Sequence, residues 1–107
     1  MIDHYVLDAD HKLRSAGLFE WAAFFEDAEA RRVGADVVGD VRVSTVFLGI
    51  DHSWGAGPPL YFETMVFGGT WDQECDRYST WDEAAAGHAE TVRRLSASLS
   101  PWNDVGP

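Results

Sequence analysis

Asp51, His52 and Ser53 are consecutive in the sequence, and they are the residue types of a hydrolytic relay. Neighbouring residues of an extended chain point to opposite sides, and no Gly-x-Ser-x-Gly turn surrounds the serine to expose it as a nucleophile. Asp51 is instead typical of a residue that ends a strand by accepting a backbone hydrogen bond, and His52 would fix the loop that follows. We predict that this segment contains no catalytic residue.

The four histidines are the first metal ligands to consider, but their spacing matches no ligand motif. None lies four residues from another, and Cys75 is the single cysteine, so the sequence contains neither a helical His pair nor a Cys pair. His88 differs from the others because it falls in the apolar stripe of the last predicted helix. A histidine there is typical of a core residue that is satisfied by a backbone carbonyl. We predict no metal site and no cofactor.

Glu63 lies in the middle of the apolar segment LYFETMVF, residues 60–67. A desolvated carboxylate there would have a raised pKa and could act as an acid or a base. A pairing across strands with Arg42 or Arg77 would instead make it structural. The alternative function, a small-molecule or metal-binding domain or a hydrolase, requires four side chains to converge in one polar pocket: Asp51, His52, Glu63 and His88.

The segment GAGPP, residues 55–59, lacks the lysine and the serine or threonine of a phosphate-binding loop. Its glycines permit a turn and its prolines stiffen the exit, which predicts a rigid, extended loop. Trp54 in this loop and Trp71 in the next one flank the 60–67 strand, either together or at opposite ends. Tryptophans on loops either anchor protein interfaces or fold back to cap a core. The candidate interaction residues are Asp51, His52, Trp54 and Trp71.

Apolar residues alternate with period two through the middle of the chain, which is typical of β-strands. The segments 32–38 and 41–50 flank the hairpin signal GD at residues 39 and 40. Apolar residues on both faces of 41–50 predict a strand that is covered on both sides, and a homodimer is one way to cover the second face. A short first strand is expected at 4–7 and a charged edge strand at 73–79.

Two segments predict helices that pack on this sheet. The first covers residues 17–32, where four apolar side chains recur at helical spacing: Leu18, Trp21, Ala22 and Phe25. The second begins at the capping box TWDE, residues 80–83, and carries an apolar stripe: Trp81, Ala85, His88, Val92 and Leu95. The predicted fold is α+β, with a mostly antiparallel sheet of four to five strands in the order β-α-β-β-β-β-α. Residues 1–98 are expected to form one domain and 99–107 a flexible tail.

The chain carries 18 acidic residues against 8 Lys and Arg, a net charge of −10. We therefore predict no direct nucleic-acid binding, since phosphate backbones are bound by basic groups. An acidic surface can steer towards a basic partner, or simply keep a small protein in solution. The acids at 72–83 leave open a second alternative, a DNA mimic that inhibits a nucleic-acid-binding enzyme. No apolar run is long enough to cross a membrane and no secretory signal is recognised, so we expect a cytoplasmic location.

Nearly the whole chain resembles a family of small uncharacterised proteins encoded by phages and prophages of high-GC, actinobacterial bacteria. The resemblance lies in YVLDADHKL, LFEWAAFFED, VSTVFLGIDHSWGAGPPLYFETMVFGG and RYSTWDEAAAGHAETVRRL. It implies a context, an accessory protein acting inside a bacterial host cell, and no particular chemistry. We expect a non-enzymatic protein-interaction module that binds a basic host or phage protein.

Overall fold

A computed structural model describes residues 3–99 of the chain. In chain order the elements are β1 (His4–Leu7), β2 (Leu13–Ala16), α1 (Leu18–Glu26), α2 (Ala28–Arg31), β3 (Arg32–Val38), β4 (Val41–Phe47), β5 (Phe62–Phe67), β6 (Cys75–Tyr78) and α3 (Trp81–Leu99). The expected tail, 99–107, lies outside the described residues except for Leu99, which ends α3.

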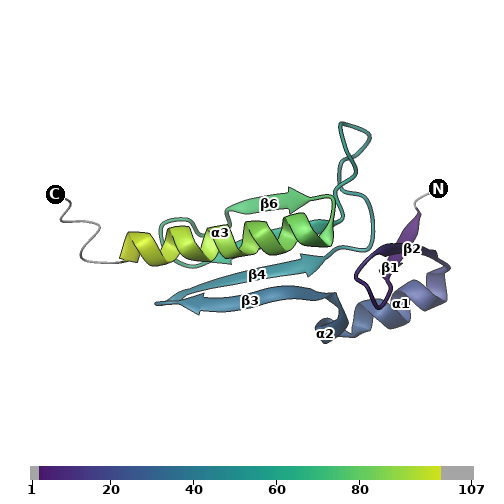
Figure 1. Ribbon diagram of the computed structural model, residues 1–107, viewed down its shortest axis with the longest axis horizontal. Helices are drawn as coiled ribbons and strands as arrows, with labels where there is room; N and C mark the ends of the chain where they lie inside the picture. Colours follow the sequence, from purple (N-terminus) through teal and green to yellow (C-terminus); the bar gives the residue numbers. More distant parts are fainter. Residues whose placement is uncertain (1–2, 100–107) are drawn as a thin grey trace.

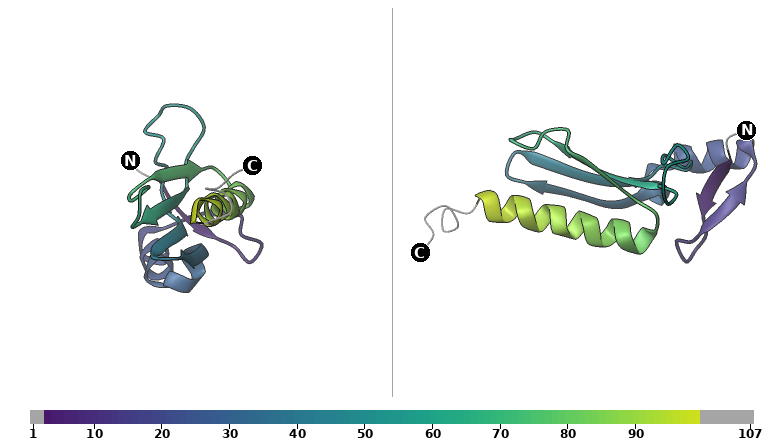
Figure 2. Two further views of the ribbon diagram at one scale, coloured as in Figure 1. Left: turned by 90° about the vertical axis from the view of Figure 1, so that its left-hand side faces the viewer. Right: turned by 90° about the horizontal axis from the view of Figure 1, so that it is seen from above.

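Strands β3 to β6 form one antiparallel sheet in the order of the chain, and α3 runs along one of its faces (Figures 1 and 2). The hairpin of β1 and β2 forms a separate two-stranded sheet, which lies with α1 beyond one end of the larger one. The predicted α+β fold with an antiparallel sheet is confirmed. The prediction did not include β2, because Leu13–Ala16 has no apolar alternation.

The core lies between the sheet and α3. Alternate residues of β4 and β5 are buried there because successive side chains of a strand point to opposite faces. These buried residues are Val41, Val43, Thr45, Phe47, Phe62, Thr64 and Val66. The helix contributes Ala84, His88, Thr91 and Leu95. Ala84 therefore takes the buried position that we expected for Ala85, which is exposed.

The expected helix over residues 17–32 is divided in two. Asp27 interrupts it because its side chain accepts a hydrogen bond from the Ala30 backbone N–H and caps α2. Of the expected apolar stripe, Trp21 and Phe25 are half-buried while Leu18 is 58% exposed. The helix start at Thr80 is as expected, since the Thr80 hydroxyl accepts from the Glu83 backbone N–H.

Within residues 3–99, α3 covers one face of β4, and the covering of its second face stays a prediction. Figure 2 shows α3 along one face of the sheet and no described helix over the other. The half-buried Val46 and Met65 and the exposed Phe67 lie on that second face.

Within residues 3–99 we find no helix with the length and apolarity that a membrane crossing requires.

Candidate functional site

The loop between β4 and β5 is closed at its base by Asp51. Its Oδ1 accepts hydrogen bonds from the backbone N–H groups of Ser53 (2.7 Å) and Leu60 (2.9 Å), and its Oδ2 accepts one from the Ser53 hydroxyl (3.0 Å). The His52 backbone N–H donates to the Leu60 carbonyl. One carboxylate therefore joins the two ends of the loop, which is the structural role that the sequence predicted for Asp51.

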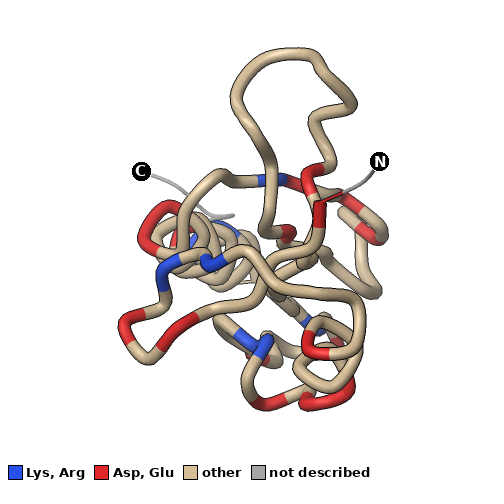
Figure 3. The backbone as a smooth tube through the Cα atoms, turned by 90° about the vertical axis from the view of Figure 1, so that its right-hand side faces the viewer, with Lys and Arg blue, Asp and Glu red and all other residues tan. Residues whose placement is uncertain are grey.

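Trp54 is the exposed feature of this loop, with 70% of its surface accessible. It adopts a positive φ of 54°, a conformation that is unusual for a bulky residue and needs support from its surroundings. The His52 ring lies edge-on to the indole, with 5.5 Å between the ring centroids. Residues 52–60 carry no Lys, Arg, Asp or Glu, and in Figure 3 the loop stands out from the body as an uncharged segment.

Replacing Asp51 with alanine should loosen this loop and leave the sheet intact. The hydrogen bonds from Leu60 and Ser53 lower the pKa of Asp51 below its ordinary value of 3.8. A group with a lowered pKa stabilises the folded form above its ordinary pKa and loses that effect as the pH falls through the lower one. We expect amide exchange at Ser53 and Leu60 to be roughly threefold to tenfold faster in Asp51→Ala. The wild type should show the same change on acidification below about pH 4.

Asp72 supplies the matched control for that experiment. Its Oδ1 accepts from the Gly68 backbone N–H (2.7 Å) in the loop that follows β5. Asp72→Ala should therefore speed exchange at Gly68 and leave Leu60 unchanged. Equal protection of Leu60 in the Asp51→Ala variant and the wild type would show that the loop is held by other contacts.

Trp71 does not lie with Trp54. It follows β5, whereas Trp54 precedes it, and a six-residue strand separates the two loops. Trp71 packs on the core cluster that contains Val41 and Leu95, and the Arg94 guanidinium lies 5.0 Å from the centre of its ring. Trp71 therefore caps the core, and Trp54 alone retains the exposure that an interface anchor requires.

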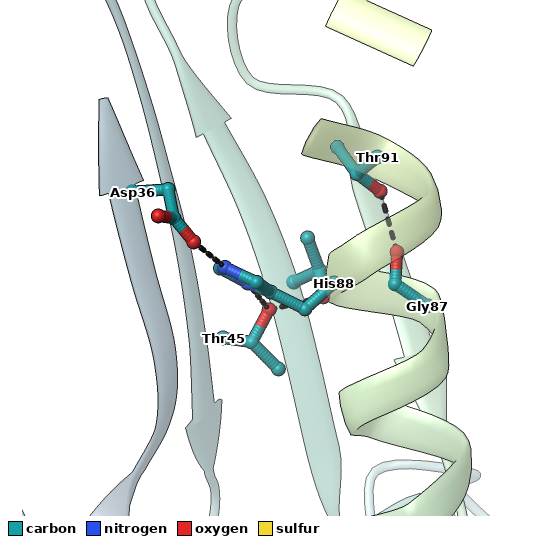
Figure 4. A network of polar contacts seen from close by, with 6 residues as sticks. Asp36, Thr45, Gly87, His88 and Thr91 are labelled. Carbon is teal, nitrogen blue, oxygen red and sulfur yellow. Dashed lines mark hydrogen bonds and ion pairs between the residues drawn. The ribbon is translucent and has the colours of Figure 1, made fainter. Parts of the chain in front are cut away.

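His88 is the centre of a buried polar network (Figure 4). Its Nε2 lies 2.7 Å from Asp36 Oδ2 and its Nδ1 lies 2.7 Å from Thr45 Oγ1. The Thr45 hydroxyl is in turn hydrogen-bonded to the Thr64 hydroxyl. Because an ionised carboxylate only accepts, Nε2 donates to Asp36, and Nδ1 shares a hydrogen bond with the Thr45 hydroxyl. The prediction of a core histidine is confirmed, but its partners are the side chains of Asp36 and Thr45 and not the backbone carbonyl that we expected.

The network continues at both ends into residues that touch glycines. Tyr78 lies beside Thr64, and burial raises the pKa of its phenol. The His88 ring lies against Gly34, where an added Cβ would be 2.8 Å from ring atoms, and Tyr78 lies against Gly87. Because glycine has no Cβ, Gly34 leaves room for the His88 ring and Gly87 leaves room for the Tyr78 ring.

An aspartate, a histidine and a hydroxyl in hydrogen-bonded order are also the parts of a nucleophilic relay. A nucleophile must be reachable by its substrate, and Thr45 is 0% exposed. The network is therefore built to satisfy buried polar groups between β3, β4, β5 and α3.

Glu63 does not share a pocket with His88. Glu63 pairs with Arg77 across β5 and β6 (3.0 Å) on the face of the sheet that points away from α3. The sheet itself separates the two side chains, while Asp51 is engaged at the base of the loop. The pocket that the hydrolase alternative requires is not formed, because the four side chains do not converge. No group of three or more potential metal ligands occurs among residues 3–99.

The acidic residues of segment 72–83 make different contacts. Glu74 pairs with Arg94 (2.8 Å), and Asp72 is turned to the Gly68 backbone. Asp76 shares the helix-facing side of the sheet with Thr64 by register. Two of these acids are therefore engaged within the protein, and the DNA-mimic alternative stays a prediction.

Sequence reasoning did not identify Asp36, Thr45 or Thr64 as partners of His88. The available signal was the pair of threonines at the centre of two apolar strands, since a buried hydroxyl needs a partner. The register that brings Thr45 opposite Thr64 comes from the structure alone.

In comparisons with protein-family models, curated proteins and solved structures, the chain matches none of them.

Proposed function

We propose that the protein is a non-enzymatic interaction module that binds a basic host or phage protein through the loop of residues 51–60. The observation that carries the proposal is the 70% exposure of Trp54 on a loop whose ends are tied by Asp51. Tryptophan is enriched among the residues that dominate binding energy. A fixed loop also loses little conformational entropy when it binds.

The charges of the body support a basic partner. The loop is uncharged from 52 to 60, whereas the chain as a whole has a net charge of −10. Such a distribution suits an apolar contact at the loop with electrostatic steering by the surrounding surface. Association should then slow as the salt concentration rises, while the contact made by the indole is little affected.

Site-specific photocrosslinking tests the proposal directly. A benzophenone amino acid replaces Trp54 in one variant and Phe19 in another, so each variant exchanges one exposed aromatic residue for another. Phe19 is 89% exposed at the start of α1 and lies outside the loop. After irradiation in cells of the natural host, we expect position 54 to give a specific adduct with a basic protein at a yield at least about tenfold above position 19.

The second stage uses the captured protein in purified form. Trp54→Ala should weaken its binding by about tenfold or more, and Trp54→Phe by less, since phenylalanine retains an apolar ring. The proposal fails if positions 54 and 19 give equal adduct yields, or if Trp54→Ala binds as the wild type does.

A further inference from the structure

The indole of Trp54 is left open to solvent, and in this it differs from Trp71 and Trp81. The Arg94 guanidinium lies over the ring of Trp71, 5.0 Å from its centre. The His11 imidazole is stacked on the ring of Trp81, with 3.7 Å between the ring centroids and 10° between the planes. Trp54 is instead 70% exposed, so its ring surface is available to a partner.

The His52 ring lies beside the Trp54 indole without being stacked on it. The two planes are inclined at 65°, and the ring centroids are 5.5 Å apart. In such an edge-to-face arrangement one ring directs its edge at the other, so His52 contacts at most one face of the indole. At least one face of the Trp54 ring is therefore not covered by this neighbour.

A free indole face attracts cations, because the negative end of the ring quadrupole lies on the two faces. The protein uses this attraction elsewhere, since the guanidinium groups of Arg31, Arg42 and Arg94 lie between 4.0 and 5.0 Å from the centres of aromatic rings. Within residues 3–99 no Lys or Arg lies over Trp54 in this way, and residues 52–60 contain neither. The cation that this face can accept is therefore one that a partner supplies.

The carboxylate at the base of the loop favours the approach of such a cation. Asp51 accepts hydrogen bonds from two backbone N–H groups and one hydroxyl, which are neutral donors. The bond from Leu60, and after it the bond from Ser53, lowers the pKa of Asp51, so the carboxylate is ionised at neutral pH. In the part of the chain that the structure describes, no Lys or Arg forms an ion pair with it. Its negative charge therefore attracts cations from solution.

We propose that Trp54 receives an arginine of the basic partner, whose guanidinium group stacks on the free face of the indole. This inference rests on the proposed function, because it names the contact that the loop makes with that partner. Arginine fits better than lysine, since its planar guanidinium stacks on aromatic rings and is more weakly hydrated than an ammonium group. Residues 52–60 carry no carboxylate, so the indole is the group of the loop that holds the cation.

An arginine tripeptide tests this chemistry without the natural partner. The probe is acetyl-glycyl-arginyl-glycine amide, which carries one positive charge. Its control is the same tripeptide with citrulline, the neutral isostere of arginine. The indole N–H signal of Trp54, assigned as the signal that Trp54→Phe removes, is followed by NMR at constant ionic strength. We expect a saturable shift with the arginine peptide, at an affinity about threefold or more above that of the citrulline peptide.

Trp71 supplies a control within the same molecule, because Arg94 already lies over its ring. Its indole signal is assigned from Trp71→Phe. We expect this signal to show no preference for the arginine peptide over the citrulline peptide. A preference at Trp54 that is absent at Trp71 separates binding at the free indole face from a general attraction of the acidic protein for a cationic peptide.

Fluorination of Trp54 separates the attraction for a cation from an apolar contact. Fluorine atoms withdraw electron density from the ring face and leave the ring apolar. A trifluorinated tryptophan at position 54 should therefore bind the arginine peptide about threefold or more weakly, and the citrulline peptide no more weakly than the wild type does. The inference is overturned if the arginine peptide does not shift the Trp54 signal, if the two peptides bind equally, or if fluorination does not weaken arginine binding. None of these results bears on the crosslinking yields at positions 54 and 19, which decide the proposed function separately.

Discussion

Thr45→Val should lower the free energy of unfolding by about 2 kcal/mol, although the two side chains have nearly the same shape. Thr45 is fully buried, and its hydroxyl is shared between His88 Nδ1 and the Thr64 hydroxyl. Valine removes that hydroxyl and leaves the imidazole nitrogen without a partner in a site that water cannot reach. An unpaired buried polar group costs more than the hydrogen bond itself contributes, so the loss outweighs the greater hydrophobicity of valine.

Thr91 is the matched control, because it is also a buried threonine at the interface of α3 and the sheet. Its hydroxyl donates to the Gly87 carbonyl within the same helix (2.9 Å), so no other side chain depends on it. Thr91→Val should change the free energy of unfolding by less than about 0.5 kcal/mol. Urea unfolding followed by tryptophan fluorescence measures both values. If the two variants are equally stable, the network around His88 contributes nothing beyond packing.

Thr45→Ser separates the hydroxyl from the shape of the side chain. Serine keeps the oxygen and loses one methyl group, so its cost should be about 1 kcal/mol from lost burial. The order of stability should therefore be wild type, then serine, then valine. The reverse order of serine and valine would mean that methyl packing, and not hydrogen bonding, governs this position.

The strands of the larger sheet and the helix α3 that packs on it could be predicted because their sequence signals are local. The glycine at residue 39, the alternation in 41–47 and the capping threonine at residue 80 each act over a few residues. The division of the first helix at Asp27 was missed because the capping hydrogen bond competes with a strong apolar pattern around it. The separate β1–β2 hairpin was missed for a different reason, since Leu13–Ala16 pairs through its backbone and has no apolar alternation.

The candidate site could be predicted only where a residue acts on its own neighbours in the sequence. Asp51 was correctly assigned to the loop base because the groups that donate hydrogen bonds to its carboxylate lie within nine residues of it. His88 was recognised as a core residue, but Asp36 is 52 residues away and Thr45 is 43. Which face of the sheet a side chain occupies depends on register, and register separates Glu63 from His88. No local pattern contains that information.

Gly87→Ala should destabilise the protein by about 2 kcal/mol, against the ordinary effect of this substitution in a helix. Alanine is favoured over glycine by about 1 kcal/mol in a helix interior because glycine loses more backbone entropy on folding. At residue 87 an added Cβ would overlap the hydroxyl oxygen and two ring carbons of Tyr78. Tyr78 cannot simply withdraw, because its ring packs on the core of Phe47 and Phe62.

Ser96→Ala and a double-mutant cycle distinguish this clash from a general effect of alanine in α3. Ser96 is exposed on the same helix, so Ser96→Ala should stabilise the protein by a few tenths of a kcal/mol. In a Tyr78→Ala background the obstruction is gone, and Gly87→Ala should then be stabilising by about 1 kcal/mol. The sign of the Gly87→Ala effect thus depends on Tyr78 alone. If Gly87→Ala does not destabilise the protein that contains Tyr78, the close approach of α3 to the sheet at Gly87 is wrong.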